Sequence, residues 1–351
     1  MTATPGTPDV PRPAGAIYDI GYQHYDGKRL GRAGAMRALY VHGLRAIFGL
    51  GRGVRAKIPP VALVAFILIP AVIQVAVVGL AGNAVQLFTH ATYFRTTVWV
   101  FALFCAFQTP ELVTGDQQYR VLALYFSRAI SRSDYVLARL GALFTALFVV
   151  ALLPHIVLLV GTWFAADNVF TAARDSVSII PRILIGAAGV SLLLSSVSLT
   201  LAALIPRRPF ATAAILTVFI LTSAFILPLV LNRPAKMRYL VLASPADVGI
   251  GFTRWVFDTT HGDSTFAQRQ FTDSVEQVAA QARMNARFDS LPDSVKARRG
   301  GHPPVVRQRF RRPRGLLDTA SLPGSIFLVT TCGLLILAGG VLTWRYRRVE
   351  T

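Results

Sequence analysis

The chain has 351 residues, of which 53% are hydrophobic and only 15% are charged, and its mean hydropathy is +0.51. A soluble protein carries about 25% charged residues, because polar groups must cover its surface. The composition therefore argues against a soluble protein. It predicts an all-α, polytopic membrane protein whose soluble parts are small.

The net charge is +19, from 36 Lys and Arg against 17 Asp and Glu. In a soluble protein this excess indicates a nucleic-acid partner. In a membrane protein it indicates basic loops that stay in the cytoplasm and face anionic lipid. We favour the second interpretation, because the apolar segments require a lipid bilayer in any case, and we expect no nucleic-acid partner.

The N-terminal segment 1–57 contains nine Lys and Arg and no apolar core typical of a signal peptide. Within it, 35–55 has apolar residues on one helical arc and arginines on another, which predicts an amphipathic helix in the membrane interface. Its glycines also allow a basic linker without a continuous helix.

Uncharged windows locate the membrane spans, because about 20 apolar residues cross roughly 30 Å of hydrocarbon. Six transmembrane helices are expected. The first five lie within 58–232, and 319–351 contains the sixth and a short cytoplasmic tail. The first five are expected at about 60–82, 93–110, 140–166, 183–206 and 209–232.

The window at 96–110 is short, with 15 uncharged residues between Arg95 and Glu111. It is a full span if Arg95 reaches an interface, and a buried or re-entrant segment otherwise. We favour a span.

Orientation follows from the basic residues in short loops. With both termini in the cytoplasm, 18 Lys and Arg lie inside and three lie in the short outside loops. The 15 others fall in the long loop 233–318, between helices five and six, which is then extracytoplasmic. Its apolar part at 239–257 is too interrupted to span, and it either lies on the membrane surface or dips into it.

The sequence contains no recognisable catalytic, nucleotide-binding or metal-binding motif. There is no P-loop, HExxH or GxSxG motif, the six histidines show no metal-ligand spacing, and Cys105 and Cys332 lie far apart in apolar segments. We expect no enzyme activity, metal or cofactor in this chain.

Polar residues within the spans could line a pathway, although helix packing explains them at least as well. No carboxylate lies in the six windows, which argues against an ion-coupled transporter. The candidates for lining a pathway are Gln74, His155, Ser191, Ser195 and Ser198.

The loop 111–139 is amphipathic and rich in charge, and its serines could cap the third span. Its sequence with flanks, PELVTGDQQYRVLALYFSRAISRSDYVLARLGAL, resembles the stretch between the second and third spans of type-2 ATP-binding-cassette (ABC) exporter permeases. The matching residues are Glu111, Gly115, Leu124, Ser127, Arg128, Ser131, Arg132 and Tyr135. Segments 16–57 and 239–257 also resemble parts of such permeases.

The resemblance implies a permease of the bacterial cytoplasmic membrane that works with a second permease, identical or paralogous, and with separate ATPase subunits that bind ATP and Mg²⁺. In that family the loop between spans two and three docks on the ATPase. The alternative is a non-transporting membrane anchor or sensor whose 233–318 loop binds a partner. The coupling residues implied are Glu111, Asp116, Arg120, Tyr125, Ser127, Arg128, Ser131, Arg132 and Asp134.

Overall fold

The computed structural model describes residues 27, 30–81, 88–127, 130–166, 168–232, 238–257 and 322–347. These residues are predominantly helical and include no strand. Most of the expected loop 233–318, together with Arg128, lies outside the described residues.

Six helices are long and apolar enough to cross a bilayer, which confirms the predicted number and makes this a membrane protein. The fifth of them is one continuous rod made of an α-helical part, a π-helical turn and a second α-helical part. The six are α2 (Val54–Ala81), α3 (His90–Gln118), α5 (Arg132–Phe164), α7 (Ile180–Leu204), the rod α8 (Arg208–Leu216), η1 (Thr217–Leu221) and α9 (Thr222–Asn232), and α15 (Gly324–Arg347).

The helices extend beyond the uncharged windows. The second span runs over 90–118 instead of 93–110, and it contains both Arg95 and Glu111. At 1.5 Å per residue its 29 residues measure about 43 Å, more than the hydrocarbon requires. The third span likewise begins at 132, because charged residues in its first two turns have partners on neighbouring helices.

The centre of the bundle is formed by α3 and α7, the most buried of the six spans, whereas α2 and α15 are the least buried. Helix α5 packs against α7, α2 and α3. Large apolar side chains on the outer face of α2 are exposed, as expected of a surface that meets lipid. Examples are Val61, Phe66, Ile69 and Val72.

The N-terminal helix α1 (Gly31–Ile47) is shorter than the helix expected over 35–55. Two glycines with positive φ, Gly49 and Gly51, form a turn before α2 begins at Val54, and left-handed backbone of this kind ends a helix. Helix α1 packs along α5 and α3 and buries Leu39 and Ile47 there. The expected apolar face therefore meets protein instead of only lipid, while Arg37 and Arg45 remain exposed.

The segment 239–257 inserts into the bundle. After the short 3-10 helix η2 (Arg238–Ala243), α11 (Pro245–Val256) packs against α7, α15 and α3, with every residue from Pro245 to Arg254 buried. A Cβ at Gly189 of α7 would lie 2.0 Å from the Phe252 ring, so α11 approaches α7 this closely only because position 189 is glycine. This segment is therefore packed among the spans and does not lie along the outside of the bundle.

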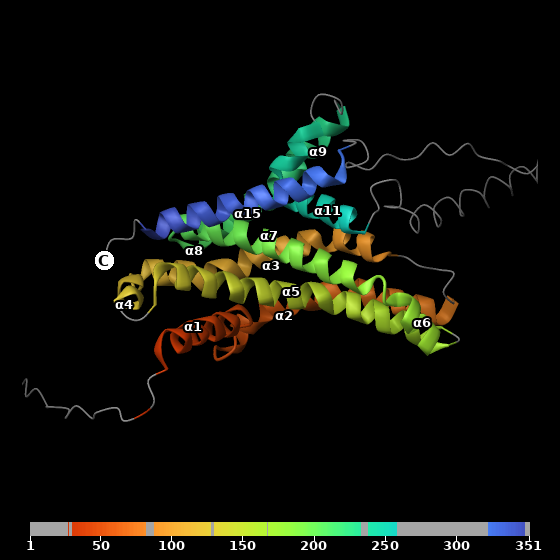
Figure 1. Cartoon of the computed structure of the whole chain (residues 1–351), viewed down its shortest axis with the longest axis horizontal. Coiled ribbons are helices and arrows are strands. Elements are labelled where there is room, and N and C mark those ends of the chain that lie inside the picture. Colours follow the sequence, from red (N-terminus) through yellow and green to blue (C-terminus); the bar gives the residue numbers. More distant parts are fainter. Residues whose placement is uncertain are drawn as a thin grey trace, which may run out of the picture.

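Figure 1 shows that the ends of the long helices sort into two groups. At one end of the bundle α1, α4 (Leu122–Phe126), the start of α8 and the C-terminal end of α15 gather. At the opposite end lies α6 (Val169–Ser176), a short helix capped by Asn168. The described chain therefore begins and ends on the same side.

Candidate functional site: the charged end of the bundle

We call the end that carries α4 the charged end. It comprises α1, the turn before α2, the last turns of α3, α7 and α15, the short helix α4, and the first turns of α5 and α8. Three carboxylates from the predicted coupling loop lie there, and each accepts hydrogen bonds from an arginine of another element. They are Glu111, Asp116 and Asp134.

Glu111 joins three elements. Its two oxygens accept from Arg52, in the turn before α2, at 2.5 Å and from Arg208, at the start of α8, at 2.8 Å. All three side chains are partly exposed, so the pairs add little stability. Their effect is to hold the start of α8 beside α3.

Asp116 joins α3 to α5 through side chains that are more buried than those around Glu111. Its Oδ2 accepts from the Tyr135 hydroxyl at 2.7 Å and from Arg139 Nη2 at 2.5 Å. The Arg139 guanidinium also lies 5.4 Å from the centre of the Tyr135 ring. A desolvated ion pair with an added hydrogen bond fixes the relative position of the two helices.

Asp134 fixes the start of α5. Its side chain and that of Ser131 form a capping box, in which each accepts from the backbone N–H of the other. Arg32 of α1 donates two hydrogen bonds of 2.7 Å to the same carboxylate. The carboxylate raises the pKa of Arg32 and thereby keeps the guanidinium charged.

Helix α4 projects between α3 and α5. Arg120, which precedes it, has φ of 54°, a left-handed conformation uncommon outside glycine, and turns the chain sharply out of α3. Tyr125 and Phe126 pack on the ring of Tyr135, with ring centres 6.1 Å apart in both cases. Burial, followed by the charge of Asp116, raises the pKa of Tyr125.

The other face of this turn is open. Tyr119 and Leu124 are among the exposed large apolar side chains, with relative exposures of 73% and 59%. Arg132, just after the turn, donates to the Arg347 carbonyl of α15 at 2.6 Å and lies over Phe126. Helix α4 therefore has a fixed inner face and a free outer face.

The predicted coupling residues that the structure describes all lie at the charged end, but they differ in role. Glu111, Asp116 and Asp134 are bound to arginines of this chain, whereas Arg120 and Ser127 are exposed. The partners Arg32, Arg52, Arg139 and Arg208 were not singled out as site residues. Nothing local could have identified Arg32, Arg52 and Arg208, because 59 to 102 residues separate them from the carboxylates they bind. Arg139, in contrast, lies within the predicted loop itself.

The five candidates for lining a pathway are all buried, and among the described residues His155 Nε2 and Ser191 Oγ have no hydrogen-bond partner. Gln74 binds both the N–H and the carbonyl of Phe88, and the His155 Nδ1 lies 3.0 Å from that of His90. Ser195 and Ser198 donate to carbonyls of their own helix, and Ser191 is buried on the same helix. In the part of the chain that the structure describes, no three potential metal ligands gather.

Comparison with known proteins leaves the family open. No protein-family model matches the chain, and no curated protein matches it. The resemblance to type-2 ABC permeases therefore stays a prediction.

Proposed function

We propose that this chain is the membrane-spanning permease subunit of an ABC exporter, which moves a substrate with ATP hydrolysed by a separate ATPase subunit. The observation that carries the proposal is the exposed outer face of α4 on a segment fixed from behind. The six-helix bundle and the resemblance of 110–143 to the coupling segment of type-2 permeases support it.

The contacts on the inner face of α4 would transmit a displacement of α4 to the neighbouring helices. A partner that pushes α4 acts on α3 and α5 together, because Asp116 and Arg139 join them. From there Asp134 and Arg32 connect to α1, while Glu111 and Arg208 connect to α8. A partner that contacts α4 differently with and without ATP would bias the bundle between two arrangements.

Charge supports the orientation. Arginines and the single described lysine concentrate around the charged end. The helices toward the opposite end contain Arg95, Arg174 and Arg182, and the segment after the fifth span contains Arg238 and Arg254. By the positive-inside rule the charged end faces the cytoplasm, with both termini on that side, in a bacterial cytoplasmic membrane.

A second permease, identical or paralogous, completes the proposed unit. Gln74 and Ser198 form hydrogen bonds within this chain, whereas Ser191 Oγ and His155 Nε2 are buried without a partner among the described residues.

The test uses a pair of matched substitutions at opposite ends of the molecule. Leu124→Asp places a charge on the exposed face of α4, and Phe170→Asp places one on exposed α6. In complexes purified from native membranes, we expect Leu124→Asp to abolish permease-stimulated ATP hydrolysis and Phe170→Asp to preserve it. Charge reversal at Arg128 and Arg132 should act like Leu124→Asp.

Equal hydrolysis by both variants would contradict the coupling role. A complex that contains no ATPase but a protein bound through 233–318 would favour the membrane anchor or sensor instead.

A further inference from the structure

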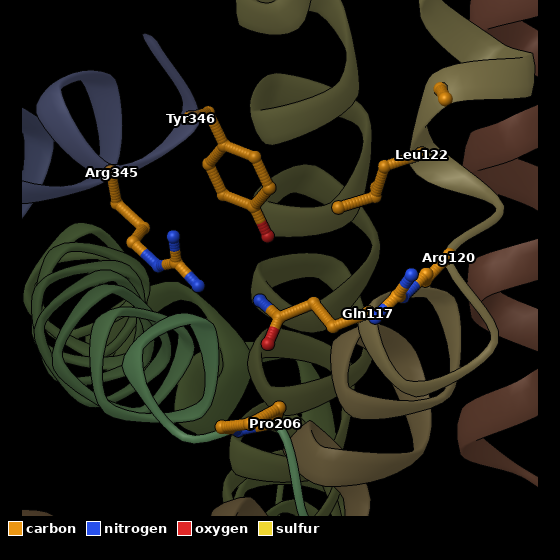
Figure 2. Close-up of a pocket in the computed structure, with 7 residues that line it drawn as sticks. Gln117, Arg120, Leu122, Pro206, Arg345 and Tyr346 are labelled. Atoms are coloured by element: carbon orange, nitrogen blue, oxygen red, sulfur yellow. The ribbon is translucent and has the colours of Figure 1, made fainter. Parts of the chain in front are cut away.

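A cavity of about 430 Å³ lies at the charged end, behind α4. It is bounded by the last turn of α3, by α4, by the turn between α7 and α8, and by the C-terminal turn of α15. Its volume is in the range of small-molecule sites. The lining includes Gln117, Arg120, Leu122, Pro206, Arg345 and Tyr346 (Figure 2).

The charge of the lining is positive. Arg120 and Arg345 come from different parts of the chain, and none of the described residues that line the cavity is acidic. The nearby carboxylates Glu111 and Asp116 are already paired with arginines. The cavity therefore attracts anions.

Two buried polar atoms face the cavity without a full hydrogen bond. The Tyr346 hydroxyl lies near the side chains of Gln117 and Tyr135, but within the described residues neither this hydroxyl nor Gln117 Oε1 has a partner in hydrogen-bond geometry. Figure 2 shows the Tyr346 hydroxyl, the Arg345 guanidinium and the Gln117 amide directed toward a common space. Buried groups of this kind cost stability unless a ligand or water satisfies them.

The arginine beside them is held in place. Arg345 Nε and Gln117 Nε2 both donate to the Ala203 carbonyl, at 3.3 and 2.9 Å. This shared acceptor orients the guanidinium and leaves its terminal nitrogens for another acceptor. An arginine oriented in this way suits a phosphate, which it binds through two parallel hydrogen bonds.

We propose that this cavity binds a phosphate ester that carries a neighbouring hydroxyl group. Arg345 and Arg120 bind the phosphate from two sides, and the Tyr346 hydroxyl donates to a phosphate oxygen. Gln117 Oε1, an acceptor, receives the ligand hydroxyl. A phosphoglycerol group has this combination, either as the headgroup of an anionic lipid or as a soluble ester.

Occupancy would tie the end of α15 to the turn between α3 and α4, because Arg345 lies on α15 and Arg120 lies in that turn. This inference does not depend on the proposed transport function, since the cavity is formed by this chain alone.

The full chain in detergent, titrated with phosphatidylglycerol or phosphatidylcholine and followed by native mass spectrometry, tests the proposal. We expect one tightly retained phosphatidylglycerol and weaker retention of phosphatidylcholine. Arg345→Gln and Arg120→Gln should each weaken phosphatidylglycerol binding about tenfold, as expected for loss of a charge-assisted hydrogen bond. Tyr346→Phe, which preserves the packing of the ring, should weaken it about threefold.

Arg347→Gln is the matched control. It removes the same charge two residues along α15, from an exposed side chain outside the cavity lining, and should leave binding unchanged. Displacement of the lipid by glycerol 3-phosphate would identify a soluble ester as the ligand source, and failure to displace it would identify a lipid headgroup. Equal binding of the two lipids, or equal effects of Arg345→Gln and Arg347→Gln, would overturn the proposal.

Discussion

Arg139 of α5 and Asp116 of α3 form an ion pair with Nη2 2.5 Å from Oδ2, and only 2% of the Arg139 side chain is exposed. Removing one partner leaves the other charge buried and unpaired, which typically costs about 3–5 kcal/mol. We expect Asp116→Asn and Arg139→Met each to lower the unfolding free energy in detergent by about this amount.

The double variant should lose less than the sum of the two single variants, because it leaves no isolated charge. Arg208→Met, at a pair exposed to solvent, should cost about 1 kcal/mol or less. Simple additivity of the two substitutions at 116 and 139 would show that the pair is not coupled.

The capping box of α5 makes a local prediction. Ser131→Ala removes the acceptor for the Asp134 backbone N–H and should cost about 1 kcal/mol. Hydrogen exchange should speed up in the first turn of α5 and remain unchanged in the rest of the helix. Ser178→Ala, at an exposed serine of the opposite end, is the control and should leave this exchange unaltered.

We expect the stability of the protein to depend on pH through His42 of α1. Partial burial, followed by the positive charge of Arg139, lowers the pKa of His42 below its ordinary value of 6.5. The unfolded chain therefore takes up a proton on His42 more readily than the folded chain, so stability is full above pH 6.5 and falls as the pH drops below it.

His42→Gln should remove part of this acid sensitivity. The difference in unfolding free energy between the wild type and His42→Gln should change between pH 7.5 and pH 5, with the wild type losing more. Parallel pH profiles would show that His42 titrates normally in the folded protein.

The close contact between α7 and α11 requires glycine at position 189. Gly189→Ala places a methyl group against the Phe252 ring and should destabilise the protein by about 1–3 kcal/mol, although alanine favours a helix. Gly340→Ala, where nothing lies within 4 Å of the added Cβ, should be neutral or stabilising. Thermal unfolding in detergent measures both, and Phe252→Ala should make the change at 189 less costly.

Much of the fold could be predicted because one physical quantity, the thickness of the hydrocarbon, sets the length of every span. The uncharged windows therefore located six helices correctly. Their bounds were less accurate, since Glu111 and Asp134 have arginine partners and the helices continue past them. The helix predicted over 35–55 was also too long at its C-terminal end, because Gly49 and Gly51 end α1 early.

The candidate site could be predicted only in part. The loop 111–139 was visible as a local concentration of charge. Except for Arg139, which lies in the loop itself, the arginines that bind its carboxylates were not, since Arg32 and Asp134 meet only through the packing of α1 on α5. The cavity behind α4 was equally hidden, because its walls come from three separate stretches of chain.

Site-specific photocrosslinking in native membranes tests the central claim most directly. A photoreactive residue at Leu124 reports on the exposed face of α4, and one at Phe170 reports on the opposite end of the bundle. We predict that Leu124 crosslinks to an ABC ATPase subunit and that Phe170 does not. Absence of any ATPase adduct at Leu124, in membranes where the chain is folded and abundant, would contradict the proposal that this bundle is driven through α4.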